Sequence, residues 1–215
     1  MSGGLEPAPP APLPVPSAPS PWNLPNALTV ARIVMVPLLG WMLLSHPGAP
    51  GWRWGCAAVF VVAMLTDLLD GRIARARGLV TTFGKLVDPI ADKAMTGMAF
   101  IGLSVVGELS WWVTAIILLR EWGITLLRFV VLRYGVMAAN RGGKLKTLTQ
   151  TGALVLYLLP LPSPASGWTP GAVLEALSWA LMGVALVLTV ATGLVYLRDA
   201  ARMRRDWLTG RRTDR

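Results

Sequence analysis

Charged residues, cysteine and histidine are all scarce in this sequence. Only 14% of its 215 residues are charged, whereas soluble domains usually carry about 25%. The single cysteine, Cys56, excludes an intrachain disulfide, and we expect it to pack in an apolar core. The single histidine, His46, lies far from the acidic residues considered below, which argues against a zinc site. These shortages favour an integral membrane protein.

Basic residues are absent from the first 22 positions. A secretory signal peptide needs a basic start, so we expect none here. Eight of the 17 prolines lie between Ser2 and Pro21. We therefore predict a disordered, proline-rich tail over residues 1–21.

Apolar residues occur instead in long runs, and the mean hydropathy is +0.56. A helix needs about 20 residues to cross a bilayer. The runs predict six transmembrane helices, over residues 27–44, 54–69, 85–106, 111–132, 148–161 and 172–197. The second and fifth runs are short and must borrow flanking residues. The predicted fold is all-α, with one membrane domain over residues 22–198 and a basic tail over residues 199–215.

Lysine and arginine gather in alternate connections, which predicts the orientation. Several lysines and arginines lie in each of three segments: the connection between the second and third spans, the connection between the fourth and fifth spans, and the C-terminal tail. The alternate connections hold only Arg53. Because cytoplasmic loops collect basic residues, both termini and both basic loops should face the cytoplasm of a multi-pass protein in the cell membrane. Basic residues beside spans bind anionic lipids, so we expect membrane lipids and no nucleic acid as partners.

Four aspartates lie where the second and third spans meet the cytoplasmic side. Asp67 and Asp70 are spaced i,i+3, and Asp88 and Asp92 are spaced i,i+4, so each pair shares a helix face. Carboxylates that converge near a bilayer repel one another and need a cation. Hard divalent ions such as Mg²⁺ suit oxygen ligands and substrate phosphates. The alternative is a set of structural ion pairs with neighbouring basic residues, namely Arg72, Arg75, Arg77 and Lys93.

Small residues and an arginine accompany the aspartates. Gly71 and Gly84 permit close approach of a ligand or of another helix, and Ala74 keeps its helix face small. Arg75 suits bidentate binding of phosphate. Together they favour a pocket for a nucleotide diphosphate, although either glycine also fits simple helix packing.

The pattern Asp67-x2-Asp70-Gly71-x2-Ala74-Arg75-x8-Gly84-x3-Asp88-x3-Asp92 resembles the signature of the CDP-alcohol phosphatidyltransferases. The resemblance implies a homodimer of six-helix membrane domains with a polar cavity facing the cytoplasm. It implies two divalent cations, Mg²⁺ or Mn²⁺, with Asp67, Asp70 and Asp88 as ligands. Asp92 would be the general base and touch a metal as well. Gly71, Ala74, Arg75 and Gly84 would line the CDP site.

Three further segments resemble the bacterial phosphatidylglycerophosphate synthases of this family. They are residues 23–32, 120–128 and 143–147. That subfamily transfers the phosphatidyl group of CDP-diacylglycerol to glycerol 3-phosphate. The resemblance therefore implies glycerol 3-phosphate as the acceptor.

Polar residues within the predicted spans agree with such substrates. Asn26, Thr29 and Arg32 lie on roughly one side of the first span, and we expect this side to face the nucleotide, with Asn26 and Thr29 binding CDP. For Asn26 a headgroup anchor is the alternative. Charge inside a span is functional by default. We expect an acceptor-phosphate socket formed by Arg120, Arg128, Lys144 and Lys146. The alternative is that the two lysines only orient the chain and that Glu121 only pairs with an arginine.

Other functions remain open at this stage. A family member with another acceptor would make cardiolipin or a phosphatidylinositol phosphate. A divalent-cation transporter also uses acidic residues in spans, but such sites belong near the bilayer midplane. A non-catalytic membrane scaffold would not require the complete acidic set.

Overall fold

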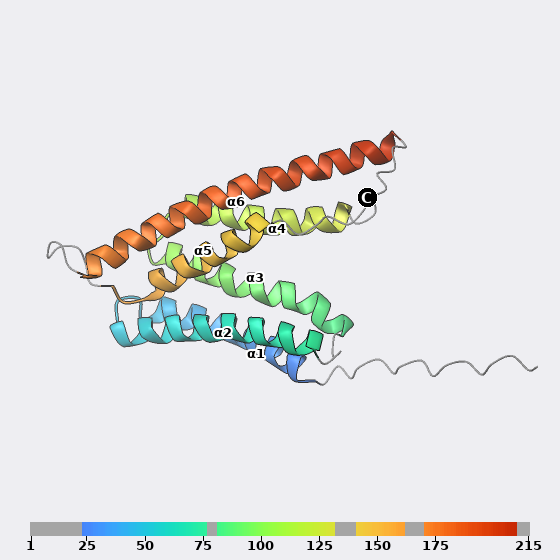
Figure 1. Cartoon of the computed structure of the whole chain (residues 1–215). Helices are drawn as coiled ribbons and strands as arrows, with labels where there is room; N and C mark the ends of the chain where they lie inside the picture. The colour runs from blue at the N-terminus through green and yellow to red at the C-terminus, as the bar shows by residue number, and fades with distance from the viewer. Residues whose placement is uncertain (1–22, 77–80, 132–140, 162–169, 210–215) are drawn as a thin grey trace, which may run out of the picture.

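The computed structural model describes residues 23–76, 81–131, 141–161 and 170–209. These residues form six α-helices and no strand (Figure 1). In chain order the helices are α1 (Leu24–Ser45), α2 (Pro50–Ala76), α3 (Thr82–Val105), α4 (Trp111–Val131), α5 (Arg141–Leu158) and α6 (Pro170–Leu208). The prediction of an all-α fold is confirmed for this part of the chain.

Side-chain caps fix the starts of α1 and α3. The side chain of Asn23 accepts a hydrogen bond from the backbone N–H of Asn26 at 3.0 Å, and Pro25 occupies the first turn of α1. The Thr81 hydroxyl accepts from the backbone N–H of Gly84 at 3.0 Å. Such caps satisfy backbone donors that have no partner within a helix. Both helices therefore begin at defined positions, at the end of the bundle that carries the aspartates.

The apolar core lies toward the opposite end of the bundle. Leu43 of α1, Phe60 of α2 and Phe100 of α3 are fully buried there, as are Ile117 of α4 and Leu154 of α5. Cys56 belongs to the same core and is fully buried, as the sequence predicts. α6 slants across α4 and α5, and its C-terminal part runs past the other helices (Figure 1). The helices are thus packed by apolar contacts at one end and leave the other end for polar side chains.

At this apolar end, Arg53 connects three parts of the bundle through hydrogen bonds. Its guanidinium donates to the backbone carbonyls of Tyr157 and of Leu158, and it pairs through two nitrogens with Glu108 at 2.6 and 2.7 Å. Arg53 is only 4% exposed. One side chain on α2 therefore connects the end of α5 with the segment between α3 and α4.

The helices match the six predicted apolar runs but differ from them at their ends. α5 begins at Arg141 and includes the Gly142–Lys146 stretch that sequence analysis left outside the fifth run. α6 continues to Leu208, so the first half of the predicted basic tail is helical. By length and composition, α1 and α6 are the two described helices that qualify as membrane spans. The predicted tail over residues 1–21 lies outside the described residues.

Candidate functional site

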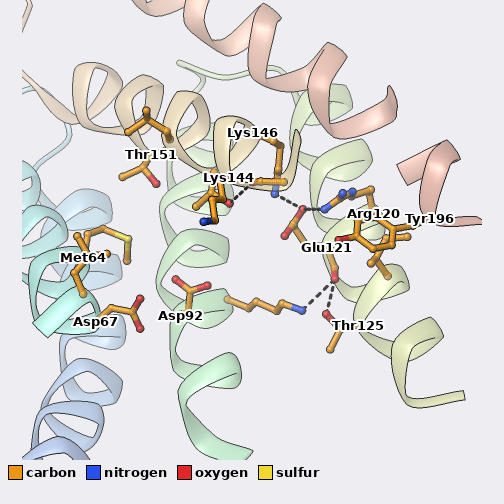
Figure 2. Close-up of a pocket in the computed structure, with 16 residues that line it drawn as sticks. Met64, Asp67, Asp92, Arg120, Glu121, Thr125, Lys144, Lys146, Thr151 and Tyr196 are labelled. Atoms are coloured by element: carbon orange, nitrogen blue, oxygen red, sulfur yellow. Dashed lines mark hydrogen bonds and ion pairs between the residues drawn. The ribbon is translucent and has the colours of Figure 1, made fainter. Parts of the chain in front are cut away.

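Four aspartates lie at the polar end of the bundle, on two neighbouring helices. α2 carries Asp67 and Asp70, and α3 carries Asp88 and Asp92. Figure 2 shows Asp67 and Asp92 directed toward the same space, and both line one cavity. Asp70 is only 3% exposed and is not among the residues that line the cavity. Each helix therefore brings one carboxylate to a shared cavity and keeps a second one close by.

α1 contacts three of the four aspartates through two buried side chains. Arg32 pairs with both carboxylates of α2: Nη1 lies 2.7 Å from Oδ1 of Asp67, and Nη2 lies 2.5 Å from Oδ2 of Asp70. One turn earlier, the hydroxyl of Thr29 donates to Oδ1 of Asp88 at 2.5 Å. Arg32 is 0% exposed and Thr29 is 1% exposed. α1 therefore holds α2 and α3 together through the acidic groups themselves.

Asn26 continues the same polar face of α1 by one turn. Its Oδ1 accepts a hydrogen bond from the hydroxyl of Thr81 at 3.1 Å. A Cβ atom at Gly84 would lie only 2.9 Å from this Oδ1. Glycine at position 84 thus allows the start of α3 to approach α1. Outside α1 and its cap, the side chain of Asn26 contacts Thr81 and that of Thr29 contacts Asp88.

The cavity has a volume of about 580 Å³ and lies between helices α2, α3, α4, α5 and α6. Its acidic wall is formed by Asp67 and Asp92. Across the cavity lie cationic and polar groups, namely Arg120, Glu121, Thr125, Lys144, Lys146 and Tyr196 (Figure 2). Lys93 and Thr151 also line the cavity. A cavity with one acidic wall and one basic wall suits a reaction in which metal-bound and phosphate groups meet.

Glu121 organises the basic wall. Its Oε1 accepts from Arg120 Nη1 at 2.9 Å and also from the ammonium group of Lys146 (Figure 2). Arg120 extends its other terminal nitrogen to the hydroxyl of Thr192 on α6, at 2.7 Å. One carboxylate therefore joins a cation of α4 to a cation of α5. The alternative expected for Glu121 was a pair with an arginine alone, whereas Glu121 pairs with Arg120 and also with Lys146.

Lys93 and Tyr196 line the cavity although sequence analysis did not place them there. The ammonium group of Lys93 donates to the backbone carbonyl of Glu121 at 3.2 Å and lies over the ring of Trp122. The guanidinium carbon of Arg120 lies over the ring of Tyr196, 5.9 Å from the ring centroid. The available signal for Lys93 was its position next to Asp92 in an apolar span. Tyr196 gave no signal, because its place depends on the slant of α6.

The structure brings five predicted site residues into the cavity: Asp67, Asp92, Arg120, Lys144 and Lys146. Lys144 is exposed, whereas Lys146 is 3% exposed. Gly71 and Ala74 are half-buried on α2, outside the cavity lining. The side chains of Arg75 and Arg128 lie outside what the structure describes, so their predicted roles stay predictions. Arg32, which sequence analysis expected to face the nucleotide, pairs with Asp67 and Asp70, and the sequence did not predict this contact. An arginine inside an apolar span was the available signal.

The donor chemistry of the acidic end fits a hard divalent cation. All four acidic groups are carboxylates, and Asp67, Asp70 and Asp88 each use one oxygen for α1 and keep the other. Within the described residues, no three acidic, histidine or cysteine side chains are grouped closely enough to hold a metal ion. Arg32 meanwhile supplies a positive charge between two of the carboxylates. Arg32 is thus the cation that the structure places beside Asp67 and Asp70.

Comparisons with known proteins agree with this chemistry. The CDP-alcohol phosphatidyltransferase family matches residues 22–191. The chain is 45% identical over 184 residues to a probable phosphatidylglycerophosphate synthase of Mycobacterium tuberculosis, covering 84% of this chain and 82% of the relative. It is 37% identical over 177 residues to the CDP-diacylglycerol–glycerol-3-phosphate 3-phosphatidyltransferase of Rickettsia typhi, covering 82% of this chain and 96% of the relative. A Bacillus subtilis protein of the same name is 37% identical over 153 residues, covering 65% and 79%. The chain belongs to the CDP-alcohol phosphatidyltransferase family.

Proposed function

We propose that this chain transfers the phosphatidyl group of CDP-diacylglycerol to glycerol 3-phosphate, giving phosphatidylglycerophosphate and CMP. The observation that carries the proposal is the cavity whose acidic wall faces a wall of basic residues. The names of the relatives support the choice of donor and acceptor. Both substrates are anionic at phosphorus, so each needs positive charge at a defined place.

The donor side of the cavity is the acidic one. We propose that Asp67, Asp70 and Asp88 hold two divalent cations, Mg²⁺ or Mn²⁺, and that Asp92 also contributes to them. When bound, such ions stabilise negative charge on the attacking and leaving oxygens of a displacement at phosphorus. Gly71, Ala74, Arg75 and Gly84 would form the nucleotide side of the site. Asn26 and Thr29 would support that side from α1.

Asp92 is the residue that we assign to proton transfer. It lines the cavity on α3, opposite the basic wall. There it would take the proton from the primary hydroxyl of glycerol 3-phosphate as the oxygen attacks the lipid-side phosphorus. A general base must reach the proton that it removes, and the acceptor would lie between Asp92 and the basic wall. CMP is the leaving group.

The acceptor side is the basic wall. Arg120 and Lys146 are held in place by Glu121, and Lys144 stands at the exposed rim. We propose that these cations, with Arg128 as sequence analysis predicts, hold the phosphate of the acceptor. Lys93 is a further cation that lines the cavity. Holding both anions in line lowers the barrier mainly by positioning and by electrostatic stabilisation.

We further propose that all six helices cross the membrane, with the cavity and both termini on the cytoplasmic side, and that the chain forms a homodimer. The support for six spans is the set of large apolar side chains exposed along the helices, among them Leu38, Leu65, Leu119 and Leu194. The support for the orientation is the basic character of the polar end. The family resemblance supports the dimer.

Release of CMP tests the function. Purified full-length protein should release CMP from CDP-diacylglycerol with glycerol 3-phosphate, and a chelator should stop this release until Mg²⁺ or Mn²⁺ is restored. Replacement Asp92→Asn should abolish turnover while expression and folding persist. Release with phosphatidylglycerol or an inositol phosphate, and none with glycerol 3-phosphate, would contradict the acceptor. Full activity of Asp92→Asn would contradict the assigned base.

A further inference from the structure

We propose that α1 forms an outer layer of the metal site, in which Arg32 and Thr29 are positioning residues. Arg32 contacts one oxygen of each of two carboxylates, Thr29 contacts one oxygen of a third, and the other oxygens would be left to the cation. This inference rests on the proposed metal dependence, but it concerns residues that lie outside the signature pattern.

The division of oxygens is the first observation. Arg32 takes Oδ1 of Asp67 and Oδ2 of Asp70, and Thr29 takes Oδ1 of Asp88. The contact with Asp67 is an ion pair without hydrogen-bond geometry, whereas Oδ2 of Asp70 and Oδ1 of Asp88 each accept a hydrogen bond. A carboxylate that is held at one oxygen keeps its plane and its rotamer. Its second oxygen is then presented in a fixed direction, which is what outer-layer partners do for metal ligands.

Burial is the second observation. Arg32 and Thr29 are 0% and 1% exposed, and both come from one face of one helix. A buried guanidinium is costly unless it is paired, and here its partners are the two acidic groups of α2. Neither residue is among those that line the cavity. Their side-chain contacts are with the carboxylates, apart from the bond of the Thr29 hydroxyl to the Pro25 carbonyl of its own helix.

Charge is the third observation. Three or four carboxylates at one end of a bundle repel one another in a low dielectric. Arg32 offsets part of this repulsion in the protein without metal, because it pairs with two of them at once. The remaining negative charge is left for cations. Arg32 thus holds two of these carboxylates in the absence of a metal ion, and folding of this end does not depend on the metal alone.

Thr29 gives the cleaner test, because its replacement changes no charge. Binding of Mn²⁺ to full-length protein in detergent would be followed by electron paramagnetic resonance. We expect Thr29→Val to weaken Mn²⁺ binding about 10- to 100-fold, as loss of an outer-layer partner does. The matched control Thr29→Ser keeps the hydroxyl and should keep the affinity. Equal Mn²⁺ affinity in the valine and serine variants would overturn the role of Thr29.

Arg32 is tested in the metal-free protein. In EDTA, Arg32→Gln should lower the thermal midpoint by about 5 to 10 °C, because two buried carboxylates lose their counter-charge. Addition of Mg²⁺ should raise the midpoint of this variant more than that of the wild type. The control Arg72→Gln removes an exposed arginine from α2 and should change neither value. A midpoint of Arg32→Gln equal to that of the wild type in EDTA would overturn the role of Arg32.

The outcomes separate this inference from the proposed function. Wild-type protein that releases CMP and binds Mn²⁺, together with a Thr29→Val variant that binds Mn²⁺ equally well, would sink the inference alone. Wild-type protein that binds no Mn²⁺ and releases CMP in chelator would contradict the inference and the proposed metal dependence, whereas absence of CMP release under all conditions would contradict the proposed function. If Arg32→Gln does not fold, the comparison of Thr29→Val with Thr29→Ser still decides.

Discussion

At the scale of single residues, Glu121 sets how much positive charge the cavity offers to an acceptor. It binds Arg120 and Lys146 through the same oxygen, so it offsets one charge while it fixes the position of two side chains. Lys146 is nearly fully buried, and Arg120 is also tied to Thr192. An acceptor phosphate would therefore meet cations that are already ordered, which reduces the entropy lost on binding.

Lys146 is the cation whose removal should be most informative. We expect Lys146→Met to raise the KM for glycerol 3-phosphate about 10- to 100-fold, because a hydrogen bond to a charged group contributes about 1.5–3 kcal/mol. The KM for CDP-diacylglycerol should change little, since Lys146 lies on the basic wall. Steady-state CMP release at varied concentrations of each substrate measures both values.

Lys144→Met is the matched comparison for this prediction. Lys144 lies two residues away and also lines the cavity, but it is exposed. Solvent screens its charge, so we expect a smaller rise in the KM for glycerol 3-phosphate. No change in either variant would leave the two lysines as orienting charges only, which is the alternative that the sequence leaves open.

The sequence predicted several residues of the site, but it did not predict which residues they contact. The spacing of Asp67, Asp70, Asp88 and Asp92 predicts shared helix faces, because helical periodicity is a local property. The pairing of Arg32 with two of these aspartates depends on how α1 packs against α2 and α3. Spacing along one helix does not carry that information. Lys93 and Tyr196 were missed for the same reason, since their neighbours come from other helices.

At the scale of helices, the approach of α1 to α3 depends on the absence of a side chain at Gly84. A Cβ atom there would lie 2.9 Å from Oδ1 of Asn26 and 3.3 Å from the hydroxyl of Thr81. These two groups are hydrogen-bonded to each other, so neither is free to move away. The glycine that the signature pattern contains therefore has a packing reason in addition to any contact with a nucleotide.

We expect Gly84→Ala to destabilise the protein by about 1–3 kcal/mol, the usual cost of overpacking, and to reduce CMP release. Gly97→Ala on the same helix is the control. A Cβ atom at position 97 would lie 3.7 Å from its nearest neighbour, which is an ordinary contact distance. Thermal unfolding in detergent compares the two variants. Equal midpoints for both variants would show that the start of α3 tolerates a side chain.

The ends of the helices were predicted less well than their existence. The Gly142–Lys146 stretch has two glycines and two lysines, so its average hydropathy hides the first turns of α5. The structure keeps it helical because Lys146 is buried against Glu121. α6 likewise continues beyond the apolar run, because arginine has a high helix propensity and its side chain can remain in water. In both cases the polar residues form helix, but the apolar runs do not include them.

At the scale of the whole molecule, the two ends of the bundle differ in whether their basic side chains are paired and buried or exposed. At the apolar end Arg53 is buried and neutralised by Glu108, so it adds little to the charge of that side. At the polar end the basic residues of α5 and α6 include exposed side chains such as Lys144, Arg198 and Arg202. The difference strengthens the argument from basic residues, which predicts that the polar end faces the cytoplasm.

This orientation is tested by labelling introduced cysteines, because Cys56 is the only native one. In a Cys56→Ala background, cysteine would replace Gly48 between α1 and α2, Ala76 at the end of α2, or Arg202 on α6. With six spans, a membrane-impermeant maleimide should label Gly48→Cys in intact cells. The Ala76 and Arg202 variants should react only after permeabilisation, and the background protein should not react. If α1 and α6 alone crossed the membrane, Ala76→Cys would react together with Gly48→Cys. The pattern at position 76 therefore decides between six spans and two, and the pattern at position 202 decides on which side the cavity opens.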